Sequence, residues 1–193
     1  ILAIRHNLAP IILIQACAAL LVLAFYQLPS VRGFAEVLQG WKVRGGEVFV
    51  VGAGFFAGGI LPNFAKVVTG RATRFDKGFW QEVAFTGMVY AIVGVEVDAL
   101  YQVQAHLFGT GVDTGTVLKK NLVDMAIFSP FISIPTATSL FEWRKASYSA
   151  RSLTANFNFQ FFQRRVLTGL IPCWAFWIPM LCCVYALPMN LQY

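Results

Sequence analysis

Charged side chains are scarce in this sequence of 193 residues. Lys, Arg, Asp and Glu make up 12% of it, whereas an ordinary soluble domain carries about 25%. Hydrophobic residues make up 58%, and the mean hydropathy is +0.64. A soluble domain of this length cannot bury so much apolar surface, which excludes a soluble globular domain, a disordered chain and a coiled coil. These values predict an all-α protein: a polytopic transmembrane helical bundle that forms one domain over residues 1–193.

Residues that usually build catalytic and metal sites are also few. The sequence has 2 histidines and 4 cysteines, and the cysteines lack metal-site spacing. It contains no hydrolase elbow, phosphate loop or dinucleotide fingerprint. We therefore expect no enzyme, no catalytic residue and no metal site, and we interpret the cysteines as small buried apolar side chains. No cofactor-binding residue is indicated; bound lipid is expected, and pigment only if the chain belongs to a photosynthetic complex.

Five apolar stretches approach the roughly 20 residues that a membrane-spanning helix needs. They lie near residues 8–28, 48–65, 82–103, 121–141 and 167–187. In the third, the uncharged run Val83–Val95 is too short to cross a bilayer. The helix must therefore extend past Glu82 at one end, or past Glu96 and Asp98 at the other.

Small residues recur at helical spacing in two of these stretches. Gly54 and Gly58 form a GxxxG pattern, and Gly87 and Ala91 form a second small face. Small residues four positions apart let two helix backbones approach closely in lipid. We favour packing within this chain; the alternative is a seam between copies of the chain or with a partner subunit.

Ionisable residues at membrane depth are costly and usually face the interior of a bundle. Glu96 and Asp98 lie two residues apart, so they face different sides of the third helix. They belong either to a polar pathway or ion-pairing site, or to the membrane interface where that helix ends early. Lys120 and Asp124 lie four residues apart, so a local ion pair is the simplest interpretation of Asp124.

The fourth stretch also carries a stripe of hydroxyl and amide side chains. Its members share one sector of the helix or flank it, and they are Asn121, Asp124, Ser129, Ser133, Thr136 and Ser139. Such a stripe could line a pore. It could equally donate to carbonyl groups that Pro130 and Pro135 leave without a backbone partner, or contact other helices.

The net charge of +6 does not indicate nucleic acid, because the basic residues fall between apolar segments. With five spans, one side of the membrane holds Arg5, Lys66, Arg71, Arg74, Lys77, Arg144, Lys145, Arg151, Arg164 and Arg165. The other side holds Arg32, Lys42, Arg44, Lys119 and Lys120. Basic residues favour the cytoplasmic side, so this bias places the N-terminus on the cytoplasmic or matrix-like side.

Two segments resemble the Mpv17/PMP22 family of membrane proteins. The run Lys119-Lys120-Asn121-Leu122-Val123-Asp124, followed by Pro130, is similar to the family's Lys-Lys…Asp-Gln…Pro signature, with Met125 in the place of the Gln. The run Trp174-Ala-Phe-Trp177-Ile-Pro179, followed by Tyr185-Ala-Leu-Pro188, resembles its Trp-x-Phe-Trp-x-Pro…Val-Pro segment. The resemblance implies a four-helix unit, to which residues 8–28 add a helix.

The same resemblance implies a location and a role. We expect an integral protein of the mitochondrial inner membrane, another organelle membrane or a bacterial cytoplasmic membrane. It would act as a channel or a membrane-homeostasis factor, with Asp124, Glu96, Lys120 and Trp177 nearest to function. The alternative is a non-catalytic accessory subunit of a larger respiratory or photosynthetic membrane complex. The expected partners are the lipid bilayer and either other membrane subunits or further copies of the chain.

Overall fold

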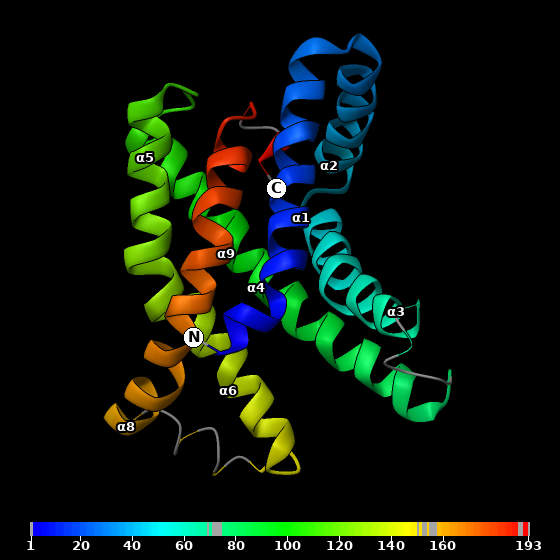
Figure 1. Cartoon of the computed structure of the whole chain (residues 1–193), viewed down its shortest axis with the longest axis vertical. Coiled ribbons are helices and arrows are strands. Elements are labelled where there is room, and N and C mark those ends of the chain that lie inside the picture. Colours follow the sequence, from blue (N-terminus) through cyan, green and yellow to red (C-terminus); the bar gives the residue numbers. More distant parts are fainter. Residues whose placement is uncertain are drawn as a thin grey trace. The chain divides into compact units, whose positions relative to one another are not determined.

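The computed structural model describes residues 2–68, 70, 75–149, 151, 154, 158–188 and 191–192, and side chains from residue 11 onward. Every element in this described part of the chain is helical, which confirms the all-α prediction (Figure 1). The α-helices are α1 (Leu2–Gln27), α2 (Pro29–Phe55), α3 (Leu61–Val68), α4 (Lys77–Phe108), α5 (Thr114–Val123), α6 (Ile134–Lys145), α8 (Phe159–Phe161) and α9 (Thr168–Tyr185). Three π-helices lie between them: η1 (Phe56–Ile60), η2 (Asp124–Ser133) and η3 (Phe162–Leu167).

Consecutive elements join into long apolar segments. Four of these are long and apolar enough to cross a membrane: Pro29–Val68, Lys77–Phe108, Thr114–Lys145 and Phe159–Tyr185. The apolar part Ile11–Gln27 of α1 is shorter. Length and composition therefore support four to five spans.

All five helical segments are several residues longer than the ranges predicted for them. The helix predicted at 48–65 belongs to a segment that begins at Pro29, and those predicted at 82–103 and 121–141 extend over 77–108 and 114–145. The helix predicted at 167–187 begins at 159 and ends at 185, and the one at 8–28 occupies 2–27. Hydropathy marks only the apolar part of a helix, whereas backbone hydrogen bonding continues into its polar ends.

A polar residue and a glycine lie at the two ends of α4. Asp76 accepts a hydrogen bond from Phe79 N–H at 2.8 Å near the start of α4, and Gly109, with φ of +81°, follows its end. A glycine tolerates this left-handed conformation, which ends helices. Because α4 continues to Phe108, the alternative that this helix ends early beside Glu96 and Asp98 is wrong.

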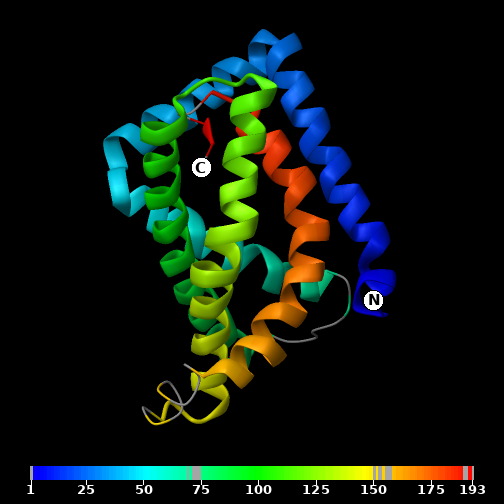
Figure 2. The same cartoon turned by 90° about the vertical axis from the view of Figure 1, so that its left-hand side faces the viewer.

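The chain divides into two compact units. The first contains Ile1–Gly40 and Leu100–Tyr193, and the second contains Trp41–Ala99, so the boundaries fall inside α2 and α4. In the first unit, α9 lies between α1 and α5 (Figure 2). In the second, α2 is interrupted at Gly46, whose φ of 51° and ψ of −131° are not helical. Glycine adopts a positive φ without the steric cost of a Cβ atom.

The predicted small residues meet inside the second unit. A Cβ atom on Gly54 would lie 2.6 Å from the Tyr90 carbonyl oxygen and 3.1 Å from Ala91 Cα. One on Gly58 would collide with the Tyr90 ring, and one on Gly59 would lie 2.6 Å from Gly87 Cα. The GxxxG face therefore packs against α4 of the same chain.

Candidate functional site

The core of the first unit contains a group of buried polar side chains, here called the polar cluster. Each of them exposes 6% or less of its surface. They come from α4 (Tyr101, Gln104), from α5 and η2 (Lys120, Asn121, Asp124, Ser129) and from α9 (Tyr185). Three membrane-length segments thus place polar groups at one point between them.

Tyr185 connects the two charged members of the cluster. Its hydroxyl donates a hydrogen bond to Asp124 Oδ2 at 3.0 Å. The Lys120 ammonium nitrogen lies 5.8 Å from the centroid of the Tyr185 ring, within cation–π range. The ring of Tyr101 packs 5.2 Å from the same ring. One tyrosine therefore contacts the buried cation with its face and the buried carboxylate with its hydroxyl.

The predicted ion pair between Lys120 and Asp124 does not form. Among the ion pairs of the described residues, none includes either side chain. Asp124 opens the π-helix η2, and its carboxylate bonds to α9 instead of to the preceding turn. Lys120, with 1% of its surface exposed, is therefore a buried cation without a paired carboxylate in the described part of the chain.

Amide side chains complete the cluster. Gln104 Nε2 donates to the Lys120 carbonyl oxygen at 3.0 Å, which ties α4 to α5. Asn121 Nδ2 donates to the Ile178 carbonyl oxygen at 3.0 Å and to Cys182 Sγ at 3.3 Å, which ties α5 to α9. Gln104 Oε1 is buried and has no hydrogen-bond partner among the described atoms. A buried acceptor without a donor is uncommon in folded proteins.

Trp174, from the family-like segment, has a structural explanation. Proline lacks an N–H group, and a π-helix pairs each N–H with the carbonyl five residues earlier. Pro130 inside η2 therefore leaves the Met125 carbonyl without its backbone donor. The Trp174 indole N–H donates to that oxygen at 2.9 Å. An aromatic residue of α9 thus replaces the missing donor of a proline in η2.

Gln15 plays the same part for Pro179, and its role was missed in the sequence. Pro179 lies inside α9, so the Ala175 carbonyl four residues earlier lacks its α-helical donor. Gln15 Nε2 donates to the carbonyl oxygens of Ala175 at 3.1 Å and Phe176 at 3.0 Å. The sequence did contain a sign of this role, because Gln15 is the single strongly polar side chain in the apolar run 8–25.

The predicted acids of the third span lie in the second unit. Asp98 forms an ion pair with Lys42 at 3.4 Å, and the two side chains expose 14% and 18% of their surface. Glu96 is half-buried. The structure thus assigns Asp98 to an ion pair with α2, which is one of the two roles expected for it.

The remaining predicted residues are spread over the first unit. Ser133 and Thr136 are half-buried, Lys119 is exposed, and Trp177 exposes 44% of its surface. Pro188 follows the end of α9. The structure therefore brings Lys120, Asn121, Asp124 and Ser129 together and leaves the others outside the cluster.

The described residues do not gather three His, Cys, Asp or Glu side chains as metal ligands. All four cysteines are free thiols; Cys17 and Cys182 are exposed, which corrects the expectation that they are buried. No protein-family model, curated protein or solved structure matches the chain. The resemblance to Mpv17/PMP22 therefore depends on the motif residues alone. Chemically, the polar cluster offers a cation, a carboxylate, a phenol and an unsatisfied amide oxygen for protons, water or small polar solutes.

Proposed function

We propose that this protein is an integral membrane protein of the Mpv17/PMP22 type with five spans, and that the polar cluster belongs to a channel-like pathway. One observation carries the proposal: Lys120 and Asp124 are both buried among membrane-length helices and are not paired with each other. Small polar solutes or ions would pass this point. The basic residues favour an N-terminus on the cytoplasmic or matrix-like side of a bacterial or organelle membrane, such as the mitochondrial inner membrane.

The cost of these charges supports a functional role. Placing an aspartate or a lysine at the centre of a spanning helix costs at least about 2.5–3.5 kcal/mol. Asp124 follows the start of the apolar stretch 121–141 by three residues, about 4.5 Å along the helix, so insertion of this helix would carry its charge past the membrane interface. Neutral side chains would pack the same helices at lower cost, so these charges fit a polar pathway better than packing alone.

Reconstitution into liposomes tests this proposal. Asp124→Asn keeps the acceptor for Tyr185 but removes the charge, and we expect solute or ion flux to change by tenfold or more, as removal of a charged pathway residue predicts. Asp113→Asn, in the loop before the same helix, is the matched control and should leave flux unchanged. If Asp124→Asn lowers only the melting temperature, Asp124 is a structural partner of Tyr185 and the proposal fails.

A second candidate is a non-catalytic subunit of a larger membrane complex. Large apolar side chains of α1 are exposed, with 63% of Leu20 and 64% of Leu21 uncovered. Partner helices could cover this face as well as lipid does. Native gel electrophoresis of solubilised membranes distinguishes the two candidates, since a subunit migrates with a large complex and a channel migrates as a small species.

A further inference from the structure

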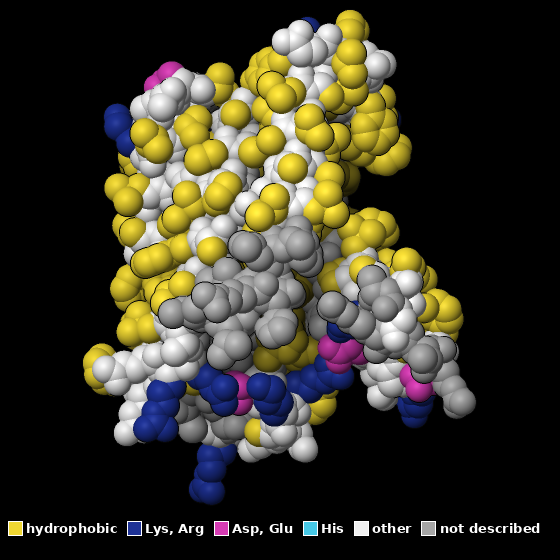
Figure 3. Space-filling view, viewed as in Figure 1, with side chains coloured by type: hydrophobic (Ala, Val, Ile, Leu, Met, Phe, Trp, Pro, Cys, Tyr) yellow, Lys and Arg dark blue, Asp and Glu magenta, His cyan; other side chains and the backbone are white. Residues whose placement is uncertain are grey.

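A charged layer lies at one end of the first unit. The last turns of α6 contribute Glu142, Arg144 and Lys145, and η3 contributes Arg164 and Arg165. In the space-filling view, basic side chains gather in the lower part of the picture, where the same view in Figure 1 shows α6 and α8 (Figure 3). These five residues are called the charged layer below.

The sequence on either side of the charged layer indicates that it lies at the level of the lipid headgroups. The residues before it, from Met125 to Phe141, carry no charge, and neither do those after it, from Val166 to Tyr193. Each uncharged run is long enough to occupy most of the hydrocarbon layer of a membrane. Both helices therefore leave the hydrocarbon layer at the same end, where their first charges appear.

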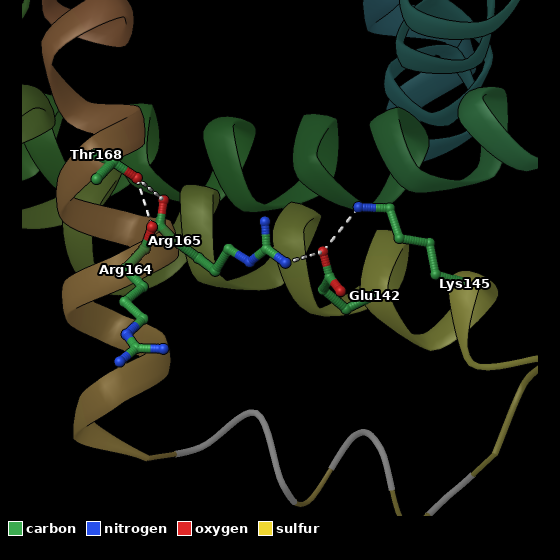
Figure 4. A network of polar contacts seen from close by, with 5 residues as sticks. All are labelled: Glu142, Lys145, Arg164, Arg165 and Thr168. Carbon is green, nitrogen blue, oxygen red and sulfur yellow. Dashed lines mark hydrogen bonds and ion pairs between the residues drawn. The ribbon is translucent and has the colours of Figure 1, made fainter.

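One carboxylate organises the basic side chains. Glu142 Oε1 pairs with Lys145 Nζ at 2.8 Å and with an Arg165 guanidinium nitrogen at 3.6 Å, so it joins α6 to η3 (Figure 4). The Arg164 side chain is exposed and points away from Glu142 in the same view. Four basic groups share the layer with this single acid, so the layer keeps a net charge of +3.

The backbone under the charged layer is held in place. The Thr168 hydroxyl donates to the Arg164 carbonyl oxygen at 2.6 Å (Figure 4). Aromatic rings surround this end: Trp143 packs on Tyr148 at 5.0 Å, and Phe131 stacks on Phe162 at 5.8 Å. Trp and Tyr side chains are typical of the headgroup region. The backbone that carries these basic groups is thus held by a hydrogen bond and by packed aromatic rings.

We propose that the charged layer binds the phosphate group of anionic phospholipids, with Arg164 and Arg165 as its main contacts. A guanidinium group presents paired N–H donors that match two phosphate oxygens, and basic groups at this depth attract anionic headgroups. Zwitterionic lipids have a compensating cation and bind less well. This site is separate from the polar cluster and depends only on insertion of these two helices.

Competition measurements on the full chain in neutral detergent test the proposal. Native mass spectrometry would count bound phosphatidylglycerol against phosphatidylcholine. We expect wild-type protein to prefer phosphatidylglycerol, and Arg164→Gln with Arg165→Gln to lose about fivefold in affinity for each charge removed. The matched control removes two exposed basic charges elsewhere, by Lys119→Gln with Arg44→Gln, and should retain the preference.

Two further arms keep the test decisive. Glu142→Gln removes the only acid of the charged layer, so we expect it to bind phosphatidylglycerol several-fold more tightly, whereas a purely structural Glu142 would give weaker binding. Inorganic phosphate at equal concentration should not displace the lipid; displacement would mean that free phosphate is the ligand. The proposal is overturned by that displacement, by equal binding of both lipids, or by equal losses in the arginine and control variants.

Discussion

At the residue scale, Tyr185 explains how a lysine and an aspartate can be buried together without an ion pair. The negative face of an aromatic ring attracts an ammonium group, and a phenol donates a strong hydrogen bond to a carboxylate. Tyr185 does both, to Lys120 and to Asp124. Sequence spacing pointed to a direct contact between the two charges, because it contains no information about a ring that lies 61 residues further along the chain.

Asp113 provides a pH-dependent helix end. Its carboxylate accepts hydrogen bonds from the Thr116 hydroxyl at 2.6 Å and from the Thr116 N–H at 3.1 Å. These bonds lower the pKa of Asp113 below its usual value, the hydroxyl bond being the larger cause. A lowered pKa in the folded chain means that the cap stabilises α5 above the usual carboxyl pKa. This stabilisation is lost as the pH falls through the folded value.

We therefore expect the start of α5 to loosen only in acid, below the ordinary aspartate pKa of about 3.9. The amide resonance of Thr116, observed in selectively labelled protein, should titrate with a midpoint below that value. Asp113→Asn should abolish the titration and keep most of the cap, because asparagine is an equally good N-cap residue. A midpoint at or above 3.9 would contradict this account.

At the element scale, two helices contain prolines whose unpaired carbonyls are satisfied by side chains of a neighbouring helix. Trp174 of α9 bonds to Met125 in η2, and Gln15 of α1 bonds to Ala175 in α9. In lipid, no water replaces a missing donor, so neighbouring helices must supply it. Each proline thus frees a carbonyl oxygen that accepts a hydrogen bond from a neighbouring helix.

Gln15 and Pro179 should therefore be energetically coupled. Gln15→Leu should lower the stability of the protein in detergent by about 1 kcal/mol, because the Ala175 carbonyl loses its donor. Pro179→Ala restores a backbone N–H at that position. In the Pro179→Ala background, Gln15→Leu should cost clearly less, and unfolding measurements on the four proteins give the coupling. Equal costs in both backgrounds would show that Gln15 does not serve the proline.

The crossing of α2 and η1 with α4 depends on glycine. Gly54→Leu should destabilise the purified protein by about 1–3 kcal/mol, because its Cβ would lie 2.6 Å from a backbone oxygen of α4. Gly52→Leu is the control, since nothing lies within 4 Å of a Cβ atom there. Equal tolerance in a thermal unfolding assay would remove the packing explanation. If Gly54→Leu leaves the purified protein stable but reduces copurification of partner chains, the glycine face is a subunit interface.

At the scale of the whole molecule, the number of crossings decides which loops share a side of the membrane. The segment Thr114–Lys145 is long enough to cross once, so the residues before and after it should lie on opposite sides. Thr110 and Ser147 flank this segment and are both exposed. With five spans, we expect Ser147 on the same side as the N-terminus, and the excess of basic residues predicts that this is the cytoplasmic or matrix-like side.

Labelling of single cysteines tests this topology. In a background without the native cysteines, Thr110→Cys and Ser147→Cys should react with a membrane-impermeant reagent from opposite sides of sealed vesicles. Ser147→Cys should react from the cytoplasmic or matrix-like side. Reaction of both positions from one side would show that the segment does not cross, and the proposal of five spans would be wrong.

The helical content and the approximate place of each span could be predicted because hydropathy acts locally. Long apolar runs must form helices in lipid, where every backbone donor needs a partner within its own segment. The helix ends could not be predicted as well. They depend on groups such as Asp76, Asp113 and Gly109, whose bonds extend the helices beyond the apolar run.

The candidate site was only partly predictable for a related reason. The family-like motif already pointed to Lys120 and Asp124, which lie four residues apart in the same predicted helix. Tyr101 and Gln104 were not among the predicted site residues, and Tyr185 appeared only within the family-like segment, because the three come from other helices and have no pattern in common. Their presence beside Lys120 and Asp124 is a consequence of packing, which brings α4, α5 and α9 together.

The sequence by itself determined the helical class, the apolar segments and the unequal distribution of basic residues, since each follows from composition along a short stretch of chain. Only the tertiary structure decided what satisfies the polar groups inside. In the structure, Lys120 and Asp124 contact Tyr185 instead of each other. Asp98 forms an ion pair with Lys42, and Gln15 donates to the carbonyl oxygen that Pro179 leaves without a backbone donor. The physical reason is that a buried polar group requires a partner within about 3 Å, and which residues come that close depends on how distant segments pack.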